Sequence, residues 1–176
     1  MATDPSVSRG RDARLLEMLE QSLAIQAPEL RLSLDRACSL VAEVLGADKV
    51  DVFLYQAESD SLVAMGTSDT PMDRWQHQLG RHRQPLVNGG PAALVFQTGA
   101  SRLTGRVDQD PAEIRGAVEA LGVRSEIDVP IEVDGTRRGV VRAATSEPDR
   151  FTVRDLRFLE AVAGWLWGTL RLTSAG

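Results

Sequence analysis

The sequence of 176 residues has one cysteine, two histidines and few aromatic residues, which make up 5% of the chain. A single cysteine, Cys38, excludes an internal disulfide and any metal cluster built on cysteines. No apolar run approaches the roughly 20 residues that a membrane-spanning helix needs. The first residues, "MATDPSVSRGRD", contain no apolar segment of signal-peptide length. We therefore expect a cytoplasmic protein with no membrane partner.

Basic residues are also scarce, with 20 Lys and Arg against 25 Asp and Glu, for a net charge of −5. The densest basic stretch is "RWQHQLGRHRQ" at residues 74–84. Because phosphate binding needs a clustered basic face, we interpret this stretch as a solvated loop and expect no nucleic-acid partner. The hydrophobic fraction of 43% is that of a globular domain with a proper core.

The N-terminal part of the chain predicts a tail, two helices and a β-hairpin. Residues 1–10 show no hydrophobic period and are predicted to be disordered, whereas leucines at three- and four-residue spacings predict a helix over residues 11–27. A second helix begins at Pro28 and stops at Gly46. "KVDVFLYQAESDSLVAMGTS" then predicts a hairpin. Neither face of its first strand is polar throughout, so we expect both faces of the sheet to be covered at least in part.

The middle of the chain predicts short elements joined by one long connection. Residues 66–91 lack a clear period, with one short helix expected at 72–79, and long connections of this kind are often functional. "AALVFQTGA" predicts a short helix closed by glycine, and "SRLTGRV" a short strand. "DPAEIRGAVEALGV" predicts a helix with Asp110 as N-cap, Pro111 at its first position and Gly122 as C-cap.

Asp134-Gly135 is the strongest hairpin signal of the chain and predicts a two-residue turn. Uninterrupted pairing from this turn would place Val129 opposite Val140. One face of the hairpin, expected to be core, would then carry Ile127, Val129, Ile131, Val133 and Val140, together with Arg138 and Arg142. The other face would carry Glu126, Asp128, Pro130, Glu132, Arg137, Gly139, Val141 and Ala143.

Glu126 and Asp128 therefore share the second, mixed face of this hairpin. One interpretation is a solvated or salt-bridged sheet surface. Another is a ligand pocket in which the two acids receive a cation or hydrogen-bond donors. Acid–base catalysis by the pair is disfavoured because no nucleophile or second catalytic group is readable nearby.

The last helix has an N-terminal capping box formed by Thr152 and Asp155. Its apolar stripe leaves Trp165 and Trp167 on different faces, so we expect at least one of them to be exposed in an isolated monomer. This exposure predicts a homodimer that pairs the N- and C-terminal helices of two chains.

The chain resembles a GAF domain over residues 28–172, followed by a short tail at 173–176. The resemblance rests on Ser125, Val129-Pro130-Ile131, Gly139-Val140-Val141, Phe151-Thr152, Asp155-Leu156 and the segment from Leu159 to Ala163. "LVAEVLGADKVDVFLYQ" is similar to the family's passage from helix to first strand. At Glu126 and Asp128 the sequence departs from the family, where apolar or small residues are commoner.

The resemblance implies an α+β fold with a central antiparallel sheet of five to six strands. Terminal helices would cover one face, and middle helices and loops would enclose a small-molecule pocket on the other. It also implies a sensory role in a signalling protein such as a two-component histidine kinase, whose output module is not in this chain. An interaction module without a ligand, or a haem sensor, are the alternatives.

The chemistries found in this family limit which cofactor or activity this chain is expected to have. A covalent bilin is disfavoured because Cys38 lies on an early helix among apolar residues. Haem would need His77 or His82 as axial ligand, in a polar segment. Methionine-sulfoxide reductases of this fold use several cysteines, and we see no phosphate loop or hydrolase motif, so the prediction is that the chain is not an enzyme. Pocket residues are predicted to be Phe53, Tyr55, Trp75, His77, Phe96, Glu126, Asp128 and Val141, with Phe53 and Phe96 equally compatible with plain core.

Overall fold

A computed structural model describes residues 30–114 and 116–174 of the chain. The predicted tail at 1–10, the predicted helix at 11–27 and residues 175–176 lie outside these ranges. The backbone of Trp167 is described, but its side chain is not. No helix within the described ranges is long and apolar enough to cross a bilayer.

Six strands form one antiparallel sheet in the order β3-β2-β1-β6-β5-β4. In chain order the strands are β1 (Lys49–Gln56), β2 (Ser61–Thr67), β3 (Arg83–Pro85), β4 (Arg102–Thr104), β5 (Ser125–Val133) and β6 (Thr136–Thr145). The central pair, β1 and β6, joins the N-terminal hairpin to the C-terminal one. The sheet is thus built from two hairpins side by side, each extended by a short edge strand.

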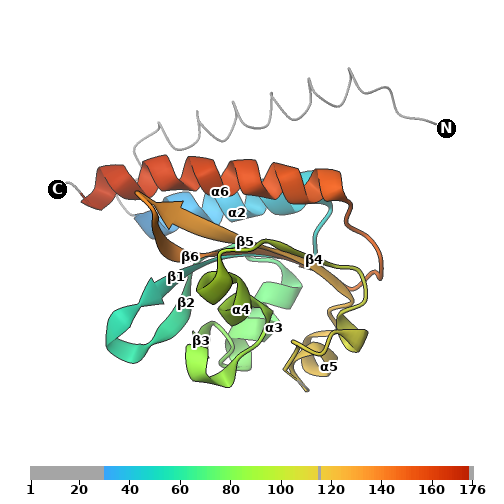
Figure 1. Cartoon of the computed structure of the whole chain (residues 1–176). Coiled ribbons are helices and arrows are strands. Elements are labelled where there is room, and N and C mark those ends of the chain that lie inside the picture. The colour runs from blue at the N-terminus through green and yellow to red at the C-terminus, as the bar shows by residue number, and fades with distance from the viewer. Residues whose placement is uncertain (1–29, 115, 175–176) are drawn as a thin grey trace.

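Helices cover both faces of the sheet (Figure 1). On one face lie α2 (Leu30–Leu45), which packs on β1 and β2, and α6 (Val153–Ser174), which packs mainly on β5. On the other lie α3 (Pro71–Gln78), α4 (Pro91–Thr98) and α5 (Ala117–Leu121). Short 3₁₀ turns at Ala57–Ser59, Leu86–Asn88 and Val107–Gln109 join these elements. This α+β architecture confirms the fold class expected from the sequence.

The main hydrophobic core fills the layer between the sheet and helices α2 and α6. It includes Leu34 and Val41 of α2, Ile127 of β5 and Leu159 of α6, all at most 1% exposed. The predicted capping box also forms: the backbone N–H of Thr152 donates to Asp155 Oδ2 at 2.8 Å, and Asp155 N–H donates to Thr152 Oγ1 at 3.3 Å. The helix thus starts where the sequence places it.

The C-terminal hairpin turns at Asp134-Gly135 as predicted, with φ angles of 49° and 77° that suit a two-residue hairpin turn. The register beyond the turn was wrongly predicted. Glu132 pairs with Arg137, but Ile131 pairs with Gly139, so one residue of β6 is extra and the strand bulges. A bulge reverses the facing of every later residue on its strand.

This one-residue shift moves Arg142 and Val141 to opposite faces from those predicted. Val129 pairs with Val141, not with Val140. Val129 and Val141 belong to the core between the sheet and helices α2 and α6. Arg142 instead pairs with Asp128 on the other face. The charged face of the hairpin therefore contains an arginine that the uninterrupted register had assigned to the core.

The helix predicted over residues 110–122 is also wrong in its first half. Asp110 does not cap a helix: its Oδ1 accepts the backbone N–H of Ala112 at 3.0 Å, and its Oδ2 pairs with Arg102 at 2.7 Å. Gly116 has a φ of 86°, and α5 begins only after it. The irregular segment before α5 places Glu113 near the charged face of the sheet.

Candidate functional site

The sheet face away from the terminal helices is divided into an apolar part and a charged part. The apolar part lies under α4 and includes Phe53 and Val140, which pack with Val95 of α4, all fully buried. The charged part lies under α3 and α5. It arises because successive side chains of β1 alternate between the two faces of the sheet, so that Lys49 and Asp51 point to the same face as Phe53.

Two rows of paired residues cross the charged part of the sheet. In the first row Asp51 pairs with Arg142, Arg142 with Asp128, and Asp128 with Arg102, so that acid and base alternate across four strands. The neighbouring row places Lys49 and Glu126 on either side of Ala144. Paired residues point to the same face of a sheet, so these charges are neighbours in one buried layer.

Arg142 is the centre of the first cluster. Its Nε donates to Asp128 Oδ1 at 2.7 Å, while its Nη2 lies 3.8 Å from Glu126 Oε1, within ion-pair range but too far for a hydrogen bond. Burial raises the pKa of Glu126 and of Asp128 to about 7, although Arg142 acts to lower both. Burial acts against the charge of Arg142, but Asp128 and Glu126 outweigh it and raise the pKa of the guanidinium, which keeps it ionised.

Lys49 is the centre of the second cluster, although it is 1% exposed. Its ammonium donates to Asp51 Oδ2 and to Gln76 Oε1, the latter at 2.7 Å, and Gln76 Nε2 donates to Asp51 Oδ1 at 3.2 Å. Burial acts to raise the pKa of Asp51, but the charge of Lys49, hydrogen bonds from Asp73 and Lys49, and the charge of Arg142 together outweigh it, so the pKa lies below its usual value. Burial and the neighbouring Asp51 raise the pKa of Asp73 to about 8.

The buried layer has more acids than bases, and several of its polar atoms lack partners. Six of these atoms have no hydrogen-bond partner among the described residues: Asp73 Oδ1, Arg102 Nη1, Glu113 Oε1, Glu126 Oε1, Asp128 Oδ2 and Arg142 Nη2. An unmet buried polar atom costs about 1–3 kcal/mol, so natural proteins keep few of them without a reason. The cluster is therefore built to meet a further polar group or a proton.

A cavity of about 90 Å³ opens onto this cluster. Its lining includes Arg142 of β6, Gln76 of α3, and Glu113 and Ile114 of the irregular segment before α5. The rest of the lining is Arg81, Arg83, Gln84, Pro85, Asn88, Gly89, Gly90, Pro91 and Leu121. The cavity is several times larger than the roughly 10–15 Å³ that a cavity needs to hold one water. Glu113 and Arg142, whose charges are opposite and which each carry a buried polar atom without a hydrogen-bond partner, therefore line the same cavity.

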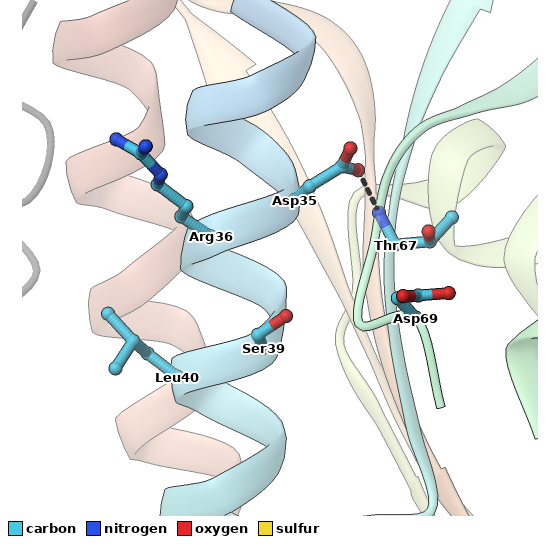
Figure 2. A pocket seen from close by; sticks show the side chains of 6 residues that line it. All are labelled: Asp35, Arg36, Ser39, Leu40, Thr67 and Asp69. Atoms are coloured by element: carbon cyan, nitrogen blue, oxygen red, sulfur yellow. Dashed lines mark hydrogen bonds between the residues drawn. The ribbon is translucent and has the colours of Figure 1, made fainter. Parts of the chain in front are cut away.

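A larger hollow of about 560 Å³ lies between α2 and the end of β2 (Figure 2). Its carboxylate Asp35 already accepts the backbone N–H of Thr67 at 2.8 Å, as the dashed line shows. The side chain of Asp69 is 82% exposed and pairs loosely with Arg74. No buried polar atom without a partner belongs to its lining within the described chain. This hollow is a weaker candidate than the smaller cavity.

The structure does not bring the eight predicted pocket residues together, and none of them lines the 90 Å³ cavity. Glu126 and Asp128 lie behind Arg142, buried and not solvated. Val141 is in the core on the opposite face because of the bulge. The aromatic residues Phe53, Tyr55 and Phe96 form the apolar cluster under α4, with Tyr55 and Phe96 stacked at 4.7 Å.

Trp75 and His77 lie on the outer side of α3. Trp75 is 47% exposed, and its indole N–H donates to the carbonyl of Ala120 in α5 at 2.9 Å. The rings of His77 and His82 stack at 4.2 Å and border an outer cavity of about 280 Å³. No set of three or more His, Cys, Asp or Glu residues within the described chain is arranged to hold a metal ion.

Sequence reasoning missed Arg142, Glu113 and the residues around Lys49. The signal for Lys49 and Asp51 was present, since two charges two residues apart start a strand that is otherwise apolar. Arg142 was assigned to the wrong face because a bulge leaves no clear mark in the sequence. Glu113 was hidden inside a segment that reads as helix.

Cys38 lies in the core between α2 and the sheet, 1% exposed, on the face away from the cavity. Burial, with the nearby carboxylates of Asp51 and Asp73, raises the pKa of its thiol well above the usual value. We expect the native thiol to react with Ellman's reagent at pH 8 no faster than the chain unfolds, because only the exposed thiolate is nucleophilic. Rapid labelling without denaturant, compared with the same chain in urea, would contradict this placement.

Comparison with known protein families identifies the family to which this fold belongs. The family model described as GAF domain matches residues 33–171. The chain therefore belongs to the GAF domain family, a sensory and regulatory fold, as the sequence resemblance implied. No curated protein is similar enough to count as a match.

Solved structures of low sequence identity share the fold. The GAF domain of a phosphoenolpyruvate-protein phosphotransferase from Coxiella burnetii is 20% identical, with a TM-score of 0.79 over 93% of this chain and 95% of that one. The corresponding domain from Acinetobacter is 18% identical, with a TM-score of 0.77 over 99% and 98%. A free methionine-R-sulfoxide reductase from Neisseria meningitidis, in complex with its substrate, is 24% identical, with a TM-score of 0.70 over 96% and 91%.

The prediction that this chain is not an enzyme is wrong. Its structural neighbours include free methionine-R-sulfoxide reductases, so the same fold carries enzymes as well as sensory domains. The absence of a familiar catalytic motif from the sequence therefore does not exclude catalysis.

Proposed function

We propose that this GAF domain binds a small polar metabolite in the cavity above Arg142 and acts as a sensory domain. The observation that carries the proposal is the pair of unpartnered atoms, Glu113 Oε1 and Arg142 Nη2, on two residues that line the same cavity. A ligand that meets both removes two desolvation costs at once. The cavity also lies over a buried charged layer, where polar contacts are stronger than in water.

The chemistry of these two atoms defines the ligand. Arg142 offers an N–H donor that suits a carboxylate, and Glu113 offers an acceptor that suits an ammonium group. Gln76 lines the same cavity, but both ends of its amide are already bonded to Lys49 and Asp51. The ligand is therefore a small zwitterion such as a free amino acid. The substrate complex of the Neisseria meningitidis reductase supports the idea that this fold accommodates small molecules.

The sensory role requires that binding alters the terminal helices, which carry the signal to an output module. Residues of β5 and β6 connect the two layers: Arg142 faces the cavity, while its neighbours Val141 and Ala143 pack in the core shared with α2 and α6. A shift of β6 on binding therefore reaches these helices directly. We propose that a homodimer formed through the N- and C-terminal helices reads this shift as a change between two arrangements.

A thermal-shift screen tests ligand binding. We expect one or more of the common L-amino acids to raise the melting temperature of the full chain, because a ligand that binds only the native state stabilises it by about 2.7 kcal/mol at 100 times its dissociation constant. Acetate and ethylamine, each carrying only one of the two charged groups, are expected to give no comparable shift at equal concentration.

The Glu113→Gln variant assigns the effect to the cavity. It keeps the shape of the side chain but removes its charge, so we expect the affinity for the amino acid to fall about tenfold or more. Glu119→Gln, on the exposed side of α5, is the matched control and should bind like the natural chain. If no amino acid stabilises the chain, or if both variants bind equally well, the proposal fails.

A further inference from the structure

Two helices of eight residues cover the charged and apolar parts of the sheet, and they are held in different ways. Helix α4 buries only apolar side chains, those of Pro91, Ala92, Ala93 and Val95. Helix α3 buries only Asp73 and Gln76. Met72 adds a partly buried apolar contact, and the other side chains of α3 are exposed. Polar contacts therefore hold α3 on the sheet, whereas apolar contacts hold α4.

The contacts that hold α3 form a polar latch, which we define as Lys49, Asp51, Ser68, Asp73 and Gln76. Gln76 is bonded at both ends of its amide to the β1 pair of Lys49 and Asp51. Asp73 Oδ2 accepts the backbone N–H of Ser68 at 2.9 Å and also its hydroxyl. A polar contact loses little when water replaces it, so such a latch releases more readily than an apolar one.

Gln76 also lines both the 90 Å³ cavity and the 280 Å³ outer cavity. Helix α3 therefore stands between the proposed ligand site and a hollow on the outer side of the domain. The hollow is bordered further by Arg31 of α2 and by the stacked His77 and His82. Release of α3 would join the two cavities and would leave the terminal-helix core intact.

We propose that helix α3 is the gate of the cavity, held closed by the polar latch and able to detach while the rest of the domain stays folded. The role of the gate is to regulate access to the ligand site, and this role rests on the proposed function. The latch itself is a property of the ligand-free chain and is tested without any ligand.

The charges around Asp73 make the latch sensitive to pH. The titratable groups that face it are Lys49 and Asp51 of β1, with Asp69, Arg74, His77, His82 and Arg31 around the outer cavity, while the thiol of Cys38 acts on it through the sheet. The pKa of Asp73 is about 8 when α3 is docked, against an ordinary value of 3.8. A carboxyl with a raised pKa in the docked state favours docking at low pH, and this contribution is lost as pH rises from about 4 to about 8.

Hydrogen exchange of the full, ligand-free chain, read by mass spectrometry and corrected for the intrinsic pH effect, tests the latch. We expect amides of α3 to exchange at least about tenfold faster than those of α4, the matched control helix. We also expect this ratio to increase by about tenfold or more between pH 5.5 and pH 8.

Two variants test the named residues. Asp73→Asn mimics the protonated acid, since its amide still accepts from Ser68 and donates towards Asp51, so α3 should remain docked with exchange that no longer depends on pH. Gln76→Glu replaces the donor to Asp51 by a second carboxylate and should speed exchange in α3 about tenfold, without altering α4. Equal exchange in α3 and α4 would overturn the gate, whatever the ligand screen shows; slow exchange in Gln76→Glu would overturn the latch.

Discussion

Replacing Arg142 by methionine is expected to destabilise the chain by about 3–5 kcal/mol at pH 8. Methionine keeps most of the volume of the side chain but removes the guanidinium that donates to Asp128 and pairs with Glu126. Both acids are at most 2% exposed, so without the guanidinium each must either remain an uncompensated buried charge or take up a proton, and both cost stability at pH 8. Equilibrium unfolding in urea, compared with the natural chain, measures the loss.

The loss should be smaller at pH 5. Burial already raises the pKa of Glu126 and Asp128 to about 7, and Arg142 acts against that rise. Without the arginine their pKa values in the folded chain rise further above the ordinary values. Acids with raised pKa values stabilise the fold when protonated, and this stability is lost as pH increases through 7. The free energy of unfolding of Arg142→Met is therefore closer to that of the natural chain at pH 5 than at pH 8.

Two further variants separate charge from packing. The neutral triple variant E126Q/D128N/R142M removes the acids with their partner and should recover most of the lost stability. Arg106→Met is the matched control, because Arg106 and Asp149 form an exposed pair at 2.9 Å, and exposed pairs contribute about 0–1 kcal/mol. Equal losses for Arg142→Met and Arg106→Met would show that the buried cluster lacks the importance assigned to it.

The fold could be predicted from local signals that do not depend on distant parts of the chain. Asp134-Gly135 specifies a hairpin turn through two positive φ angles, and Thr152 with Asp155 specifies a helix start through two hydrogen bonds. Alternation along β1 predicted that both faces of the sheet are covered. The predictions from sequence failed where tertiary contacts outweigh such local signals. Asp110 reads as a helix cap but pairs with Arg102 of a neighbouring strand.

The candidate site could not be predicted, because its residues meet only through a bulge and an irregular segment. Glu126 and Asp128 are two residues apart and were recognised as a pair. Their partner Arg142 required the correct register, and one extra residue in β6 changes the face of every residue after it. Glu113 required knowledge that its segment is not helical. A site built from strands and loops of different hairpins is visible only once those elements are paired.

Gly139, next to the bulge, is expected to be the least replaceable glycine of the sheet. A Cβ atom at this position would overlap the carbonyl oxygen of Phe53 and lie 3.0 Å from its carbonyl carbon. Both are backbone atoms of the paired strand β1, so no side-chain rotation relieves the contact. We expect Gly139→Ala to cost more than about 4 kcal/mol, or to prevent folding, because the central β1–β6 pair must separate.

Gly164→Ala is the matched control for this substitution. Gly164 lies in α6, exposed, with no atom within 4 Å of an added Cβ and without a positive φ. Alanine there should raise the free energy of unfolding by about 0.5–1 kcal/mol through its better helix propensity. Circular dichroism and urea unfolding of both variants measure the contrast. A stable, folded Gly139→Ala chain would mean that β1 and β6 are not paired as described; Arg142 would then no longer lie beside Asp51, and the charged layer under the cavity would not exist in this form.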